Sequence, residues 1–300
     1  MFSFTKEQKV LEISSIKIGG QPGVYPTVAF AGFFFKGNLD FNSAERNIEN
    51  MLETSNKIGI PCIPDFFIKK TEDINPILDF IEKYLPDVIP FSVDIIEPSV
   101  KIEVLKELAD RSMLSRTIYN SIHVGVKKEE IETLSKYTPE MTIAVAFNPK
   151  DSSPDGRIEV LENGAHLIDK GLLKIIEDIG IEKILVDTAA LAPGENSGSA
   201  IAALPVVKEE YGLPVGCAIH NVVEKSSWLK EFIDIKSIVD AASNITIPIF
   251  GGDFLLYGPV ELTDKVLPII AWSDILVSEY TEKYFSIQPI DDHPRRRFFG

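Results

Sequence analysis

Polar side chains recur at the points where apolar, strand-like runs of this sequence end. In "TIYNSIH" (117–123), residues that favour a pleated, half-buried surface lead into Asn120, Ser121 and His123. The other expected strand ends carry Asp94, Asn148, Asp187, His220, Asn221 and Asp253. Asp and Asn at strand-to-helix junctions are also common caps and turn formers, so any one of them alone could be structural. As a set that converges on one mouth, they predict a polar ligand there, because an unpaired buried polar group costs roughly 1–3 kcal/mol.

The residue types limit the chemistry that such a mouth could perform. No Lys or Cys nucleophile stands at an expected strand end, and no pair of histidines has metal-ligand spacing, so no metal site is expected. An Asp carboxylate can accept two parallel hydrogen bonds from the N–H/NH₂ edge of a guanine-like or pterin ring. An Asn both donates and accepts, so it can follow a nitrogen whose protonation changes. The set indicates a site for a nitrogen heterocycle.

The elements that must position these residues alternate between strand and helix. Eight apolar, β-rich runs predict parallel strands covered on both faces, at 25–36, 61–69, 88–96, 116–123, 141–149, 183–188, 214–221 and 247–254. Helical spacing is found between them at 43–59, 75–85, 98–112, 127–137, 170–180 and 199–212.

This alternation predicts an α/β fold, a (β/α)₈ TIM barrel, as a single domain over residues 1–300. A doubly wound sheet is the alternative, but the chain lacks a glycine-rich phosphate loop after its first strand. The segment "VLEISSIKI" (10–18) predicts an N-terminal hairpin that could close the barrel bottom. Catalytic groups of such barrels lie at the C-terminal ends of the strands.

Composition excludes several classes of partner. The formal charge of −15 argues against a nucleic acid, which needs a basic face, and against direct binding to an anionic membrane. Two cysteines make no disulfide framework, the start lacks a signal-peptide core, and no apolar run approaches a membrane span. We therefore expect a cytoplasmic protein, with any membrane role coming through partner subunits.

Several longer stretches resemble one known family, the H subunit of tetrahydromethanopterin S-methyltransferase and its relatives. They are "KIGGQPGVYPTV" (17–28), "RTIYNSI" (116–122), "DGRIEVLENG" (155–164), "GIEKILVDTA" (180–189), "SGSAI" (197–201), "YGLPVGCAIHN" (211–221), "GGDFLLYGPVE" (251–261) and the closing "HP" (293–294). The resemblance spans nearly the whole chain. It implies a TIM barrel of the pterin-binding methyltransferase type.

The resemblance also implies a reaction and a set of roles. Members move a methyl group between N5 of a methyl-tetrahydropterin, either tetrahydromethanopterin or tetrahydrofolate, and the cobalt of a corrinoid (cobalamin) held by a partner protein. Asn221 matches the residue that hydrogen-bonds to N5. Asp187 is the second catalytic candidate beside Asn221. The pterin ring would be held by Asp94, Asn120 and Asp187, with Ser121 and Asn148 nearby, and His123, His220 and Asp253 are further candidates. A corrinoid protein, a membrane-bound methyltransferase complex and a homodimer are the implied partners.

Two departures from the family pattern leave alternatives open. Val24 stands where the family motif has Glu, and the loop at 33–46 is short and lacks a His. One alternative is another pterin-handling barrel, similar to dihydropteroate synthase, although that reaction calls for a basic residue near the seventh strand. The other is a non-catalytic assembly subunit that kept the fold.

Overall fold

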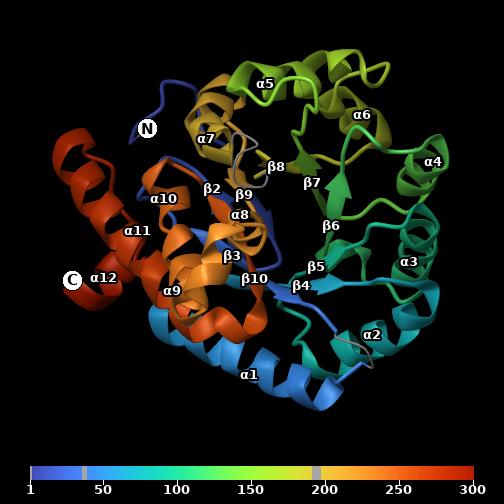
Figure 1. Cartoon of the computed structure of the whole chain (residues 1–300), viewed down its shortest axis with the longest axis horizontal. Helices are drawn as coiled ribbons and strands as arrows, with labels where there is room; N and C mark the ends of the chain where they lie inside the picture. Colours follow the sequence, from blue (N-terminus) through green and yellow to red (C-terminus); the bar gives the residue numbers. More distant parts are fainter. Residues whose placement is uncertain (1, 36–38, 191–196) are drawn as a thin grey trace.

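Eight parallel strands form a closed barrel in the computed structural model, which describes residues 2–35, 39–190 and 197–300 (Figure 1). Each barrel strand pairs with the next along the chain, and β10 closes the ring against β3. The strands are β3 (Val28–Phe33), β4 (Cys62–Phe67), β5 (Phe91–Asp94), β6 (Thr117–Ile122), β7 (Met141–Val145), β8 (Lys183–Asp187), β9 (Val215–Cys217) and β10 (Phe254–Pro259). The TIM barrel expected from the sequence is confirmed.

The predicted N-terminal hairpin is also confirmed, and it closes the bottom of the barrel. Strands β1 (Val10–Ile13) and β2 (Ile16–Gly19) pair antiparallel. Ile13, Ile16 and Ile18 pack in one cluster with Phe30 and other inward-facing residues of the barrel strands. The alternate, outward-facing residues belong to a second and larger cluster beneath the helices. The interior is therefore filled from below, which leaves the C-terminal end for a site.

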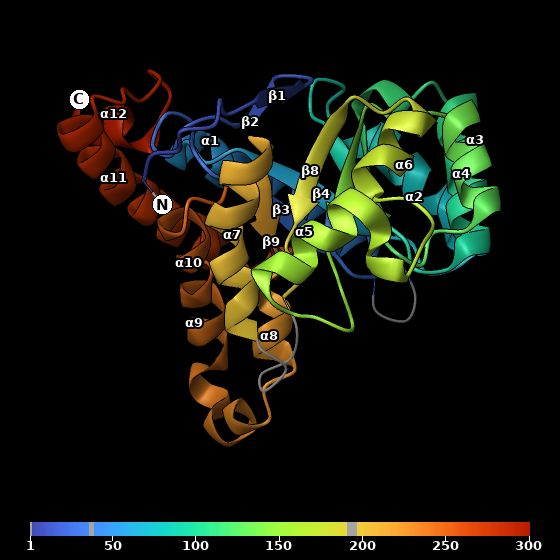
Figure 2. The same cartoon turned by 90° about the horizontal axis from the view of Figure 1, so that it is seen from above.

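Helices surround the barrel and extend past it. They are α1 (Phe41–Ile58), α2 (Thr71–Tyr84), α3 (Pro98–Asp110), α4 (Lys128–Lys136), α5 (Pro154–Asn163), α6 (Leu172–Ile179), α7 (Ser197–Tyr211), α8 (His220–Glu224), α9 (Ile233–Ser243), α10 (Thr246–Ile249), α11 (Thr263–Phe285) and α12 (Pro294–Phe299), with short 3₁₀ turns η1 (Leu114–Arg116), η2 (Gly164–His166), η3 (Trp228–Phe232) and η4 (Val260–Leu262). Figure 2 shows α8, η3 and the start of α9 projecting beyond the barrel on the side where the strands end. None of the described helices is long and apolar enough to cross a membrane.

The predicted eighth strand is wrong in its position. Residues Thr246–Ile249 form the helical turn α10, and the strand β10 begins only at Phe254. A short apolar run fits a buried helix as well as a strand, and Pro248 with the turn at Gly251 (φ 83°) ends this one. Asp253 therefore precedes its strand, at the opposite end of the barrel from the expected mouth.

Local capping explains both ends of α1. Asp40 accepts a hydrogen bond from the Ser43 backbone N–H at the start of α1, and Gly59 ends that helix at a φ of 83°. The second helix begins at Thr71, four residues before the predicted 75–85, and Pro76 lies inside it.

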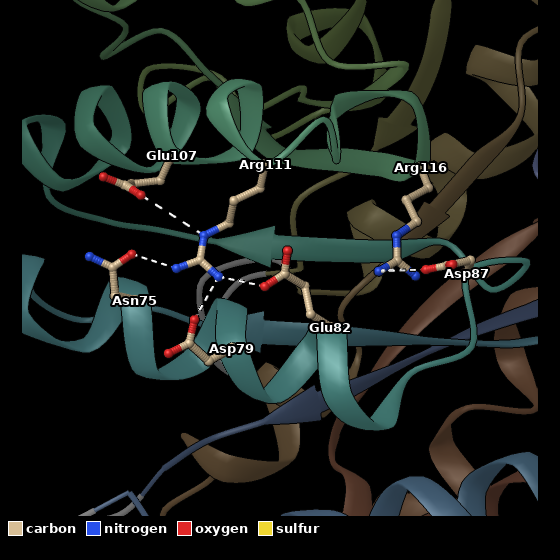
Figure 3. Close-up of polar contacts among 7 residues, drawn as sticks. All are labelled: Asn75, Asp79, Glu82, Asp87, Glu107, Arg111 and Arg116. Atoms are coloured by element: carbon tan, nitrogen blue, oxygen red, sulfur yellow. Dashed lines mark hydrogen bonds and ion pairs between the residues drawn. The ribbon is translucent and has the colours of Figure 1, made fainter.

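Charged side chains join α2 to α3 on the outer surface (Figure 3). Arg111, at the end of α3, donates to Asp79, Glu82 and Asn75 of α2, each at 2.7 Å. Arg116 lies further along, beside Asp87 at 3.6 Å. Exposed pairs of this kind contribute little each, and this network fixes how two neighbouring helices sit on the barrel.

Candidate active site

A cavity of about 390 Å³ opens at the C-terminal ends of the barrel strands. Its apolar wall is made by Phe30, Phe34, Val145, Phe147 and Leu256. Polar side chains from five elements and the loop after β6 face the same space: Asp65, Asp94, Asn120, His123, Asp187, His220 and Asn221. An apolar cavity with a few converging polar groups is the usual form of a small-molecule site.

Two carboxyl groups and an amide lie on neighbouring strands at one side of the cavity. Asp65 (β4), Asp94 (β5) and Asn120 (β6) face it, and the Asn120 amide donates to both Asp65 oxygens at 3.3 and 3.4 Å. Burial raises the pKa of Asp65, and burial together with the charge of Asp65 raises the pKa of Asp94. The pair thus resists carrying two negative charges until N–H donors of a ligand satisfy them.

Asp187 at the end of β8 is a third carboxyl group, and the backbone after the strand orients it. Its Oδ1 accepts from the Ala189 backbone N–H at 2.7 Å, and no described residue hydrogen-bonds to Oδ2, which leaves that oxygen available to a ligand. Burial raises its pKa to about 6, although the Arg157 charge opposes this. The Arg157 guanidinium is buried and donates to the Thr188 carbonyl at 2.5 Å and the Ala189 carbonyl at 3.3 Å. Arg157 therefore fixes the loop that orients Asp187.

Asn221 and His220 face the cavity from the first turn of α8, directly after β9. The Asn221 side-chain amide makes no hydrogen bond with any residue of the described chain, so it is open to a ligand. His220 Nδ1 lies 2.7 Å from Oδ2 of Asp240, on α9. His123, across the cavity, accepts from the Gly125 N–H through Nδ1 at 3.0 Å, and burial together with the charge of Lys101 lowers its pKa.

Three predicted site residues lie outside this cavity. Ser121 follows Asn120 in β6, and its carbonyl accepts from the buried Lys101 ammonium at 2.9 Å. Asn148 closes the turn after β7, donating to the Gly156 carbonyl and accepting from two backbone N–H groups. Asp253 forms a buried ion pair with Lys208 at the N-terminal end of the barrel. Ser121 and Asn148 therefore do not line the cavity, and Asp253 lies at the end of the barrel opposite the expected mouth.

Sequence reasoning missed several residues of the site. Asp65 sits within an apolar run, "CIPDFF", rather than at its end, so the rule of polar strand ends passed over it. Phe34 and Phe147, on the wall, lie just after β3 and β7 and carried no chemical signal. The Arg157 support lies in the stretch "DGRIEVLENG", which did not indicate that its guanidinium is buried.

The two departures from the family pattern fall in different places. Val24 lies away from the cavity, where its carbonyl accepts from the Ile290 N–H at 3.0 Å. The loop at 33–46 supplies Phe34 to the cavity wall, and its residues 36–38 lie outside the described residues. The replacement of Glu by Val at position 24 therefore does not touch the pocket.

A larger cavity, about 550 Å³, lies at the opposite end of the barrel. Its lining includes Ser15 and Lys17 of the hairpin segment, Tyr25, and Asp292 and Arg297 near the C-terminus. It has no set of converging buried carboxyl and amide groups, and it lies at the end of the barrel that serves stability rather than catalysis in this fold. We place the active site in the smaller cavity for this reason.

One grouping in the described part of the chain has the make-up of a metal site. His220, Glu224 and Asp240 each offer a ligand atom, all within 4.8 Å of one another. The Lys236 ammonium, however, lies 2.8 Å from Glu224, and His220 is already bonded to Asp240. Glu224 is thus paired with the Lys236 ammonium group and Asp240 with the His220 ring, so these residues form an ion-pair and hydrogen-bond network.

The groups at the mouth can form hydrogen bonds with a flat heterocycle and can respond to the transfer of one proton. Carboxyl oxygens of Asp94 and Asp187 match the N–H and NH₂ donors of a pterin edge, and Asn120 can pair with a neighbouring acceptor. Raised carboxyl pKa values near neutrality, together with a free amide at Asn221, suit a ligand nitrogen that gains a proton. The residues present therefore fit a pterin.

The chain is similar to several known proteins. The family model of the tetrahydromethanopterin S-methyltransferase MtrH subunit matches residues 6–290. The chain is 36% identical to the H subunit of tetrahydromethanopterin S-methyltransferase from Methanothermobacter thermautotrophicus, over 98% of each chain. It is 33% identical to the H subunit of the putative methyltransferase mtx from Methanosarcina barkeri, again over 98% of each. A dihydropteroate synthase of Coxiella burnetii has a similar fold, with a TM-score of 0.60 over 83% of this chain and 94% of that one, at 16% identity.

Proposed function

The chain belongs to the MtrH family of tetrahydromethanopterin S-methyltransferase subunits, and from this premise we propose that it moves a methyl group between N5 of a methyl-tetrahydropterin and the cobalt of a corrinoid carried by a partner protein. The observation that carries the proposal is the convergence of Asp94, Asn120, Asp187 and Asn221 on one cavity at the barrel mouth. The relatives are named for tetrahydromethanopterin, which makes that pterin the first substrate to test.

The pterin ring is held edge-on by the carboxyl and amide groups of the strand ends. Asp187 offers Oδ2, and Asp94 offers a carboxyl group whose raised pKa falls when ligand N–H groups donate to it. Asp65 lies behind Asn120 and fixes the direction of its amide. The apolar wall, including Phe34 and Phe147, excludes water from the faces of the ring.

Asn221 acts at the reacting nitrogen. The N5–methyl bond breaks readily only when N5 is protonated, because a neutral amine is a far better leaving group than an amide ion. The Asn221 side chain can accept from a protonated N5 and donate to the free nitrogen afterwards, so it stabilises both sides of the step. An amide is too weak an acid to supply the proton itself. The corrinoid supplies the cobalt(I) nucleophile that takes the methyl group.

A partner must reach the mouth for this transfer to occur. The relatives are named as subunits, so we propose that the chain works within a methyltransferase complex, with a corrinoid protein as its direct partner and a homodimer as its own state. Attachment to a membrane would come through the other subunits.

A dihydropteroate-synthase-like condensation is the second candidate, and the cavity disfavours it. That reaction releases pyrophosphate, which needs a cationic group beside the pterin. Of the described residues that line the cavity, none is Lys or Arg. A non-catalytic role is disfavoured by the complete carboxyl and amide set at the mouth, which a purely structural protein has no reason to keep together.

A spectroscopic assay with reduced free cobalamin tests the proposal. Methyl-tetrahydromethanopterin and methyl-tetrahydrofolate are supplied separately to the purified protein. Loss of cobalt(I) absorbance with formation of methylcobalamin, faster with one pterin than without protein, supports the enzyme and identifies the pterin. Tight pterin binding without transfer would assign an obligatory corrinoid partner. Neither binding nor transfer would refute the proposal in favour of an assembly role.

A further inference from the structure

His220 lines the cavity and also contacts Asp240, and pterin recognition does not require this second contact. His220 opens α8 immediately before Asn221, and its Nδ1 lies 2.7 Å from Oδ2 of Asp240. Asp240, on α9, is deeply buried, with a relative exposure of 3%. Figure 2 shows α8 and α9 side by side in the lobe that projects beyond the barrel, which consists of α8, η3 and α9. The pair thus joins a deeply buried carboxylate to a ring that faces the site.

The surrounding chain holds the ring in one orientation. Gly258 of β10 lies against it, and a Cβ added there would come within 2.5 Å of ring atoms Cγ, Cδ2 and Nδ1. The Cγ, Cδ2 and Nδ1 side of the ring thus lies against β10, and Nδ1 also contacts Asp240. Nε2 is therefore the ring nitrogen that can face the cavity lined by His220. A carboxylate at Nδ1 fixes the ring tautomer, so Nε2 can give up and take back a proton.

The surroundings of the pair leave Asp240 with His220 as its polar contact. Lys236, also on α9, pairs with Glu224 of α8 at 2.8 Å rather than with Asp240. Asp240 Oδ1 is buried and has no hydrogen-bond partner among the described residues. The Asp240 carboxylate therefore relies on His220 for its polar contact, and a buried carboxylate is costly unless a cation or donor compensates it. The carboxyl groups of Asp65, Asp94 and Asp187 line the same cavity, burial and the charge of Lys101 lower the pKa of His123, and the adjacent β10 residue, Gly258, carries no charge.

We propose that His220, positioned by Asp240, is the acid that protonates pterin N5 as the methyl group leaves. This inference rests on the proposed function. The proton moves from His220 Nε2 to N5, and the N5–carbon bond breaks once N5 carries it. The methyl carbon bonds to cobalt through the electron pair of cobalt(I), while the pair of the broken bond stays on nitrogen. Neutral His220 then regains a proton from water.

The test compares His220→Gln and Asp240→Asn with wild type in single-turnover methyl transfer to reduced free cobalamin, from about pH 5.5 to 8.5. Asp234→Asn, an exposed change on the same helix, is the matched control. We expect His220→Gln to slow transfer by roughly 10²-fold, the lower end for a lost general acid, with pterin affinity unchanged. Its rate should lose the decline with rising pH that wild type shows. Asp240→Asn should also slow transfer, because the ring loses the carboxylate that fixes its tautomer, and imidazole should partly restore His220→Ala.

The outcomes separate this inference from the proposed function. Transfer by wild type with an unaltered rate and pH profile in His220→Gln would overturn the role of His220 alone. A stoichiometric divalent metal in the purified protein, lost in His220→Gln, would also overturn it, because the ring would then be a ligand. Wild type that neither binds pterin nor transfers a methyl group would overturn the proposed function and this inference with it.

Discussion

Replacing Asp187 by Asn should weaken pterin binding and yet stabilise the ligand-free protein. In the native protein burial raises the pKa of Asp187 to about 6, from an ordinary value of 3.8. About two pKa units correspond to roughly 3 kcal/mol at pH 7, an upper figure for the cost of keeping this buried carboxylate ionised. The asparagine keeps the acceptor for the Ala189 N–H and removes the charge, so part of that cost is recovered.

The sign of the pH dependence follows from the raised pKa. Between about pH 4 and 6 the native protein holds a proton here that the unfolded chain has lost, so the Asp187 contribution to stability falls as pH rises through this window. Above pH 6 the loss is complete. The melting temperature of Asp187→Asn should therefore exceed that of wild type at pH 7 by several degrees, and the two should converge below pH 4.

Binding should change in the opposite direction. Because the Ala189 N–H already occupies one Asp187 oxygen, the variant loses about one charge-assisted bond to the ligand, worth roughly 1.5–3 kcal/mol, or about 10- to 150-fold in affinity. Calorimetric titration with the pterin and thermal melts from pH 4 to 8 measure both effects, with Asp234→Asn as the exposed control. Unchanged affinity together with a lower melting temperature at pH 7 would refute the reasoning.

Three further predictions follow from other parts of the structure. Asn221→Ala should slow methyl transfer by about 10²–10⁴-fold without changing the melting temperature, in the cobalamin assay; full activity would remove this residue from the mechanism. Pterin binding should release a proton near neutral pH, because ligand N–H groups lower the raised pKa values of Asp94 and Asp65. The affinity for the pterin should therefore rise with pH. Calorimetry in buffers of different ionisation enthalpy measures the number of protons released, and proton uptake would contradict the prediction. Lys208→Met should lower the free energy of unfolding by about 3–5 kcal/mol, since it leaves Asp253 buried without its cation. Denaturant melts measure this change, and a value near zero would show that the ion pair does not stabilise the fold.

The sequence allowed the barrel to be predicted because its strands are continuous apolar runs separated by helical spacing. The same signal failed at 247–254, where a proline-containing apolar turn precedes the true strand, and this error carried Asp253 to the wrong end of the barrel. Periodicity alone cannot separate such a short run from a strand.

The site was predictable where a polar residue lies at or near the C-terminal end of a strand and faces inward. Asp94, Asn120, Asp187, His220 and Asn221 all line the cavity. Ser121 was included with its neighbour, although successive residues of a strand point to opposite faces, and its carbonyl faces Lys101 instead.

Contacts between segments distant in the chain were beyond sequence reasoning. Asp240 lies twenty residues after His220 on an amphipathic helix, and only the folded lobe brings its carboxylate to the imidazole. Arg157 reaches the loop after Asp187 from α5, a helix that the periodicity had not indicated.

The crystal structure of the protein with methyl-tetrahydromethanopterin tests the central claim most directly. We expect the pterin ring in the cavity at the strand C-termini, its N–H edge on Asp94 and Asp187 and its N5 beside Asn221. A pterin bound in the larger cavity between the hairpin and the C-terminal segment, or one whose N5 faces away from Asn221, would contradict the account.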